Sequence, residues 1–217
     1  MGIQTALDAV RDAERLVDAM RLADALAFEA GRDGGARTIR ILSAAVHGDD
    51  QLLAIAATHA LGRVDDQQAD TVLTALLRNE RRFLRQHASW VLQSRSPRLQ
   101  AVGRLIELLV EGDFGGMVAQ RTLEQWSAAA GPSVAVALEG ALVGVHEADA
   151  RARLVETLGL VRDDIATEVL LRVVVSEDEH EQARAAALMA LGQRRGDERI
   201  AGVLSTCLLY TSDAADE

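Results

Sequence analysis

The residues of this 217-residue sequence that could do chemistry are five histidines, two tryptophans, one cysteine and a large set of arginines. Histidine, cysteine and carboxylate side chains at short, fixed spacings would indicate metal binding or acid–base catalysis. The histidines form no HExxH pattern, and a single cysteine cannot form a CxxC pair. We therefore predict no catalytic residues, no metal site and no bound cofactor in this chain.

Three short segments have the composition of a ligand-binding loop but lack the spacing of one. The segment GRDGG at 31–35 matches neither of the phosphate-binding motifs GxGxxG and GxxxxGK[ST]. The segment EGDFGG at 111–116 lacks the spaced carboxylates of a calcium-binding loop. The segment SEDEHE at 176–181 is an acidic run of the kind that ends or begins a helix. We interpret all three as helix ends or connectors, and we expect the ring of Phe114 to be buried.

The remaining candidates fall into register when the segments that carry them are aligned. Alanine, leucine and apolar residues recur at helical spacing throughout, and five segments close on a comparable leucine, here called the anchor and numbered position 0. The anchors are Leu61, Leu92, Leu123, Leu158 and Leu191, at intervals of 31, 31, 35 and 33 residues. A helix pair repeated at this period predicts an all-α fold, an α-solenoid of antiparallel helix pairs.

The residues that follow the anchors are typical of connectors between helices. Glycine comes directly after three anchors, as Gly62, Gly159 and Gly192, where we expect a left-handed helix stop. Acidic residues suited to begin the next helix come next, as Asp65, Asp66, Asp163, Asp164 and Asp197. Both prolines, Pro97 and Pro132, also fall in these connectors.

The register also predicts which side chains face outward. Positions −7, −4, −3 and 0 share the buried side of each second helix, whereas −2, −5 and −6 point outward. Position −2 holds His59, Trp90, Arg121, Glu156 and Met189, and we call these five residues the outward row. Because tryptophan and arginine often anchor interfaces, we predict a partner-binding surface made of His59, Gln86, His87, Trp90, Arg121, Arg153 and Glu156. The alternative is that Trp90 packs partly between repeats and the others are only solvated.

The second helices resemble the HEAT-repeat family, in its short bacterial form related to phycobilisome-lyase-type repeats. The family pattern VRxxAAxALG is matched best by Arg184 and the AAALMALG that follows it; Arg85 and Arg151 hold the same position −7, but Ala54 and Gly116 depart from it. The resemblance covers about residues 37–205. It implies a HEAT-like or armadillo-type superhelix with its second helices on the concave face. It also implies a ladder of ion pairs between repeats, interrupted where position −7 lacks arginine.

The pattern predicts three parts along the chain. Residues 1–36 form an N-terminal helical cap of one long helix or two, and residues 37–205 form about five HEAT-like repeats. The final segment CLLYTSDAADE differs in composition from the rest and resembles the translation of a sequencing-library adaptor. We therefore expect residues 206–217 to be a non-native tail, the natural protein to continue differently, and the truncated end to favour self-association.

Charge and composition reduce the number of function classes that fit this sequence. A net charge of −10 argues against a nucleic-acid binder, and no apolar run or leader is visible, so we expect a cytoplasmic protein. The first hypothesis is a non-enzymatic scaffold or regulatory module that binds an unidentified protein partner on its concave face. The alternatives are the N-terminal regulatory part of a larger, truncated enzyme and a HEAT-fold enzyme. The resemblance brings two examples of the latter, bilin lyases and DNA glycosylases, and a glycosylase-like activity is opposed by Glu156 and the acidic charge.

Overall fold

The computed structural model describes residues 2–13, 16–194 and 197–203. Within these ranges the chain contains helices and no strand. The labelled helices are α1 (Ile3–Arg11), α2 (Leu16–Asp33), α3 (Gly35–His47), α4 (Gln51–Leu61), α5 (Gln67–Leu76), α6 (Arg82–Leu92), α7 (Leu99–Glu111), α8 (Phe114–Gly144), α9 (Ala148–Leu160), α10 (Asp164–Val175) and α11 (Glu181–Gly192). The predictions for residues 206–217 lie outside the described residues.

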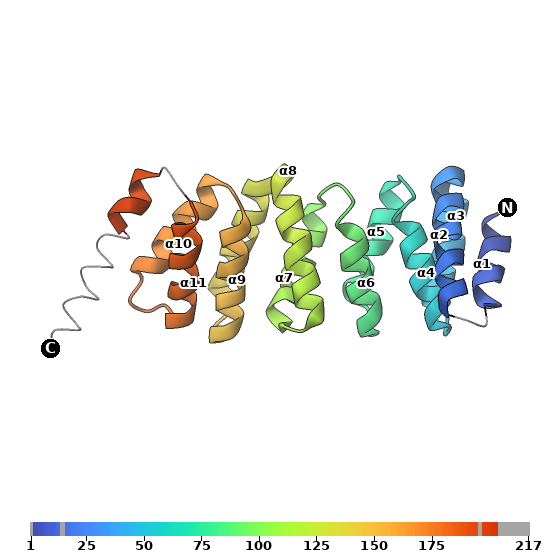
Figure 1. The fold of residues 1–217 in the computed structure, drawn as a ribbon, viewed down its shortest axis with the longest axis horizontal. Helices are drawn as coiled ribbons and strands as arrows, with labels where there is room; N and C mark the ends of the chain where they lie inside the picture. The colour runs from blue at the N-terminus through green and yellow to red at the C-terminus, as the bar shows by residue number, and fades with distance from the viewer. Residues whose placement is uncertain (1, 14–15, 195–196, 204–217) are drawn as a thin grey trace.

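The helices stand side by side along one long axis, with α1 at one end and α10 and α11 towards the other (Figure 1). One layer consists of α2, α4, α6, the first part of α8, α9 and α11, each packed on the next. The other layer contains α3, α5, α7, the second part of α8, and α10. The predicted fold is confirmed: the protein is an all-α solenoid of antiparallel helix pairs.

The anchor leucines hold the two layers together. All five are fully buried, and the position −4 side chains one turn earlier are buried with them. Four of these position −4 residues are alanines, which allow neighbouring helices to approach closely: Ala57, Ala88, Ala119 and Ala187. The register read from the anchors is therefore the register of the core.

Aspartates begin several helices as predicted. The carboxylate of Asp66 accepts the backbone N–H of Gln68 at 2.7 Å, and that of Asp163 accepts the N–H of Ile165 at 2.9 Å. Each bond satisfies a backbone donor that has no partner within its own helix.

The glycines after the anchors act differently from our expectation. None of Gly62, Gly159 and Gly192 has a positive φ; among the described residues only Gly34, Gly35 and Gly112 do. At Gly62, a Cβ would lie 2.3 Å from Cγ1 of Val91 on the next second helix. At Gly159, a Cβ would lie 2.7 Å from that of Ala190. These two glycines thus permit close packing between repeats, and the prediction of a left-handed stop was wrong.

Helix α8 joins two repeats without a loop. Its backbone leaves the helical region at Ala130 (φ −140°, ψ 34°), two residues before Pro132. Proline cannot donate the hydrogen bond that would continue the helix, so the chain bends there and crosses from one layer to the other. By length and composition α8 would also pass as a membrane-spanning helix. Its two halves pack as separate members of the array.

Phe114 is 60% exposed, so the prediction that its ring is buried was wrong. Asp113 caps α8 by accepting the N–H of Gly116 at 3.1 Å, which makes Phe114 the first residue of the helix. The glycines that follow take the inner side: a Cβ on Gly116 would lie 3.0 Å from the carbonyl oxygen of Leu108. The phenyl ring is therefore left on the outer side.

The N-terminal segment forms two helices rather than one. Helix α2 packs against α4 as α4 packs against α6, and α1 covers them with four buried side chains, Ile3, Ala6, Leu7 and Val10.

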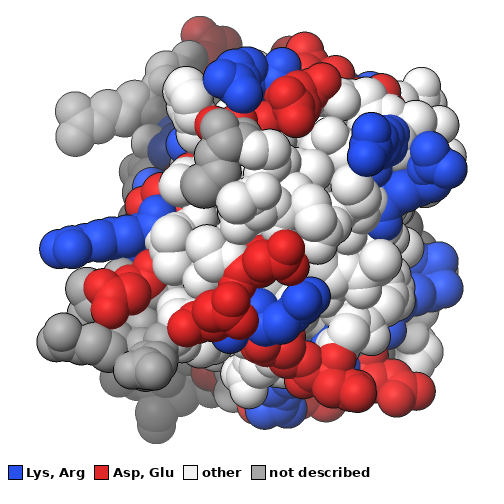
Figure 2. Space-filling view, turned by 90° about the vertical axis from the view of Figure 1, so that its right-hand side faces the viewer, with Lys and Arg blue, Asp and Glu red and all other residues white. Residues whose placement is uncertain are grey.

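At this end of the molecule, uncharged residues occupy much of the upper middle of the surface, with acidic and arginine side chains grouped around them (Figure 2).

Candidate partner-binding face

Three side chains of the predicted surface form a cluster across two neighbouring helices. His59 on α4 stacks on Trp90 of α6 with ring centroids 5.8 Å apart and an angle of 21° between the planes. His87, one turn before Trp90, lies 5.4 Å from the indole and 6.2 Å from the ring of His59. We call these three residues the aromatic cluster.

Trp90 is held by these rings but remains 50% exposed. It borders an open cleft of about 470 Å³, here called the aromatic cleft. The cleft is lined by the C-terminal ends of α4 and α6 and one residue of α8: His59, Gly62, Arg63, Trp90, Val91, Gln93, Ser94 and Gln125. A large apolar ring therefore faces solvent beside several side chains that can form hydrogen bonds.

His87 is kept neutral by its surroundings. Burial and, to a lesser extent, the nearby imidazole of His59 together lower its pKa from 6.5 to about 4. Its Nε2 atom is buried and has no hydrogen-bond partner among the described residues. His59 itself lies with Nε2 3.4 Å from the exposed carboxylate of Asp24 on α2. The cluster therefore holds one neutral, buried imidazole and one imidazole beside a carboxylate.

The rest of the outward row follows the same register without joining the aromatic cleft. Arg121 on α8 is exposed and pairs with Glu124 one turn later, at 2.7 Å. Glu156 on α9 is exposed, and Met189 on α11 is 70% exposed. The row thus changes from aromatic to charged to apolar along the array.

Two of the predicted surface residues are tied to neighbouring helices. The Arg153 guanidinium donates to the carbonyl oxygens of Leu109 (3.2 Å) and Val110 (2.7 Å) at the end of α7. A cation there offsets the partial negative charge of the helix C-terminus. Gln86 on α6 packs against the start of α8, with its Cγ 3.4 Å from where a Cβ on Gly115 would be. Their contact with a partner stays a prediction.

Phe28 extends the row onto α2, although the spacing of the anchor leucines did not indicate it. Phe28 is 70% exposed and stands two residues before Ala30, which is fully buried. Gly31 follows Ala30 as glycine follows three of the anchors, and a Cβ there would lie 3.1 Å from the carbonyl oxygen of Arg63. Helix α2 therefore repeats the register of the second helices, with alanine in place of the anchor leucine. Gly31, in the position that glycine holds after three anchors, was the sequence feature that could have indicated this repeat.

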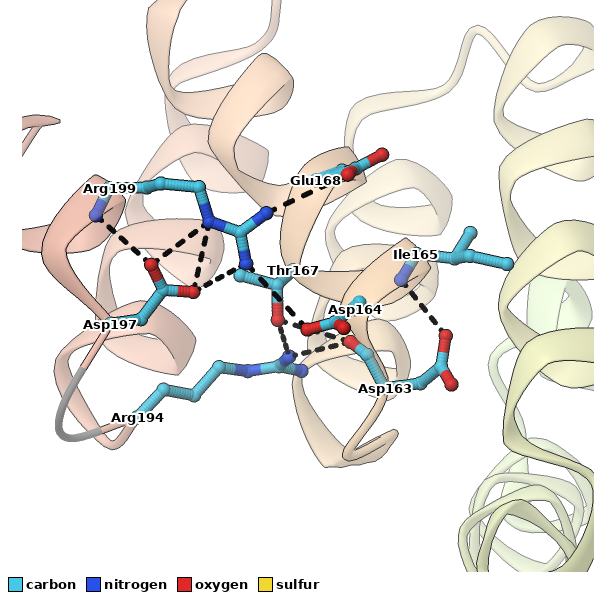
Figure 3. Close-up of polar contacts among 8 residues, drawn as sticks. All are labelled: Asp163, Asp164, Ile165, Thr167, Glu168, Arg194, Asp197 and Arg199. Atoms are coloured by element: carbon cyan, nitrogen blue, oxygen red, sulfur yellow. Dashed lines mark hydrogen bonds and ion pairs between the residues drawn. The ribbon is translucent and has the colours of Figure 1, made fainter.

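Side chains at position +3 link three of the second helices to the one before, whereas this position is valine after α4 and α9. Arg95 donates to the carbonyl of Gly62 at 2.8 Å, and the indole N–H of Trp126 donates to that of Leu92 at 3.1 Å. Arg194 donates to three carbonyls at the end of α9, including that of Val161 at 2.6 Å. Figure 3 shows it also reaching Thr167 and the backbone of Asp163. Sequence spacing gave no indication of these links.

The position −7 arginines form part of the expected ladder. Arg85 lies 3.3 Å from a carboxylate oxygen of Glu111 on the next helix pair. Arg151 donates to Glu179 at 2.7 Å, and this bond lowers the pKa of the Glu179 carboxyl. For Arg184 the described part of the chain supplies no ion pair. The arginine pairs thus cross two junctions, which Trp126 and Arg194 also cross, and Arg95 links a third, between α4 and α6.

Comparison with known proteins gives no family assignment. No protein-family model matches this sequence, and no curated protein does so. Among solved structures, the complex of CpcE and CpcF of phycocyanin lyase from Nostoc sp. PCC7120 is similar at 14% identity and a TM-score of 0.47, covering 94% of this chain and 93% of that one. Human deoxyhypusine hydroxylase in complex with glycerol is similar at 19% identity and a TM-score of 0.32, covering 95% and 94%. At these values neither likeness indicates a function for this chain.

Proposed function

We propose that this protein is a binding module that takes a segment of a partner protein along the outward row and Phe28. We also propose that its helix pairs are HEAT-like repeats. Both the sequence pattern of the second helices and the two-layer stacking of the pairs are those expected of such repeats. The observation that carries the proposal is Trp90, a half-exposed indole held in place by two imidazoles.

An exposed indole of this kind suits recognition for a physical reason. Tryptophan offers a large apolar area, and its burial by a partner contributes more binding energy than that of most side chains. Here the neighbouring rings already restrict the indole, so a partner loses less conformational entropy on contact. Most energy of an interface comes from a few such residues, and Trp90 is the best candidate on this face.

The row is long enough for an extended segment. Axes of packed helices lie about 8–10 Å apart, so the layer from α2 to α11 spans roughly 45 Å. An extended chain advances about 3.3 Å per residue, so about 14 residues would cover it. The change from aromatic to charged to apolar side chains along the row gives such a segment a direction.

The test is selection from a random 14-residue peptide library displayed on phage, with the full chain as bait. We expect enrichment of peptides whose binding is lost in Trp90→Ala, because the aromatic cleft loses its main apolar surface. The matched control is Leu99→Ala on α7, which removes an exposed apolar side chain of the other layer. Failure to enrich peptides, or equal loss in both variants, would reject the proposal.

A further inference from the structure

The aromatic cleft has the lining of a site for a negatively charged group. Apart from Gly62, Val91 and Trp90, its residues are His59, Arg63, Gln93, Ser94 and Gln125, all of which can donate hydrogen bonds. Among the described residues no carboxylate lines it, although the chain as a whole carries a net charge of −10. The carboxylate of Asp24 faces the imidazole of His59.

Arg63 is the cation of this cleft, and its guanidinium has no hydrogen bond or ion pair among the described residues. Most arginines in that part of the chain donate to a carboxylate or to helix carbonyls, as Arg95, Arg153 and Arg194 do. Arg63 is also exposed, so its planar fork of donors is available to a ligand.

A second cleft beside Arg63 contains a buried carboxylate that other arginines already neutralise. This polar cleft, of about 330 Å³, shares Gly62, Arg63 and Ser94 with the aromatic cleft. Its buried carboxylate, Asp70, is already paired with Arg95 and with Arg98, the latter at 2.6 Å. Arg63 therefore has no role in neutralising Asp70. The other carboxylate of this cleft, Asp65, is exposed and forms no ion pair with Arg63 among the described residues, so the charge of Arg63 is available to the aromatic cleft.

We infer that the segment bound at the aromatic cleft is acidic: a carboxylate of the partner pairs with Arg63, and an aromatic or aliphatic side chain next to it lies on Trp90. This inference rests on the proposed function and names the chemistry of the partner. A carboxylate fits the guanidinium through two parallel hydrogen bonds. The hydroxyl of Ser94 and the amides of Gln93 and Gln125 can donate to its remaining lone pairs.

The experiment uses the peptides selected on the full chain. We expect them to be enriched in Asp or Glu next to an aromatic or aliphatic residue. The tightest one is synthesised with a fluorescent label, together with a version carrying Asn or Gln for its acidic residues. Dissociation constants are then measured by fluorescence anisotropy on the wild type, Arg63→Gln and Arg37→Gln. Arg37 is the matched control, an exposed arginine of α3 with no side-chain partner among the described residues.

We expect Arg63→Gln to weaken binding of the acidic peptide about tenfold or more, as loss of a charged hydrogen-bonded pair does. The neutral peptide should bind the wild type about as weakly as the acidic peptide binds Arg63→Gln. The Arg63→Gln substitution should not weaken binding of the neutral peptide further. Arg37→Gln should bind like the wild type. Selected peptides that are basic or uncharged, or equal binding by Arg63→Gln and Arg37→Gln, would overturn the inference. If binding still depended on Trp90 in that case, the proposed function would stand.

Discussion

The two tryptophans of this protein lie on neighbouring second helices and have opposite roles. Trp90, at position −2 of α6, is 50% exposed and contacts two imidazoles. Trp126, at position +3 of α8, is 2% exposed and donates its indole N–H to the carbonyl of Leu92. The same side chain therefore faces solvent at one position of the repeat and joins two repeats at another.

The difference shows how the array separates stability from recognition. Position 0 and position +3 contact the adjacent helices, so their side chains determine how repeats stack. Apart from His59, which stacks on Trp90, the side chains at position −2 are exposed, which leaves them free to differ from Phe28 through Trp90 to Met189. In a stacked array each repeat contacts only its neighbours, so a change at a contact position acts on one junction.

The largest effect should come from truncating the two tryptophans. We expect Trp126→Ala to lower the free energy of unfolding by about 3–5 kcal/mol, because it removes a buried ring and leaves the carbonyl of Leu92 without its donor. Trp90→Ala should cost about 1 kcal/mol or less, as for most surface changes. Urea denaturation followed by circular dichroism measures both. Similar losses of unfolding free energy in the two variants would show that Trp90 is a core residue, contrary to the distinction drawn between the two tryptophans.

The sequence was sufficient for the parts of the fold that follow local rules. The anchor leucines recur at a regular interval and the aspartate caps act within one turn, so spacing alone predicted them. Phe28 was missed because Ala30 stands where an anchor leucine was expected. The role of Trp126 was hidden because its acceptor lies 34 residues earlier, on another repeat. Gly62 and Gly159 were misread for the same reason: their closest contacts are with the next second helix, which local sequence does not show.

The aromatic cluster should make stability depend on pH. The pKa of His87 is about 4 in the folded protein and 6.5 when unperturbed, so between these values the unfolded chain binds the proton more readily. Stability contributed by this group is unaffected above pH 6.5 and falls as the pH is lowered to 4, by on the order of 3 kcal/mol. His87→Leu cannot titrate and should lose less stability over that range. Parallel losses in both proteins, measured by urea denaturation at each pH, would contradict the assignment.

Two glycines at position +1 offer a test with effects of opposite sign. Gly62→Ala should destabilise by about 1–3 kcal/mol, because its methyl group would overlap Val91 on the next helix. Gly192→Ala should be neutral or stabilise by up to about 1 kcal/mol, since nothing lies within 4 Å of the new Cβ and alanine favours the helix. Thermal unfolding of both variants measures the difference. Equal effects would mean that helix propensity, rather than packing between repeats, governs this position.

The most direct test of the binding face uses the difference between the two tryptophans. Trp126→Phe keeps a ring in the core and leaves Trp90 as the only fluorescent indole in the chain. Quenching of its emission by acrylamide is then measured with and without a saturating amount of the selected peptide, after circular dichroism has shown that the fold is retained. We predict that the peptide lowers the quenching constant, because it covers the exposed half of the Trp90 ring. A quenching constant unchanged at saturation would show that the partner binds elsewhere.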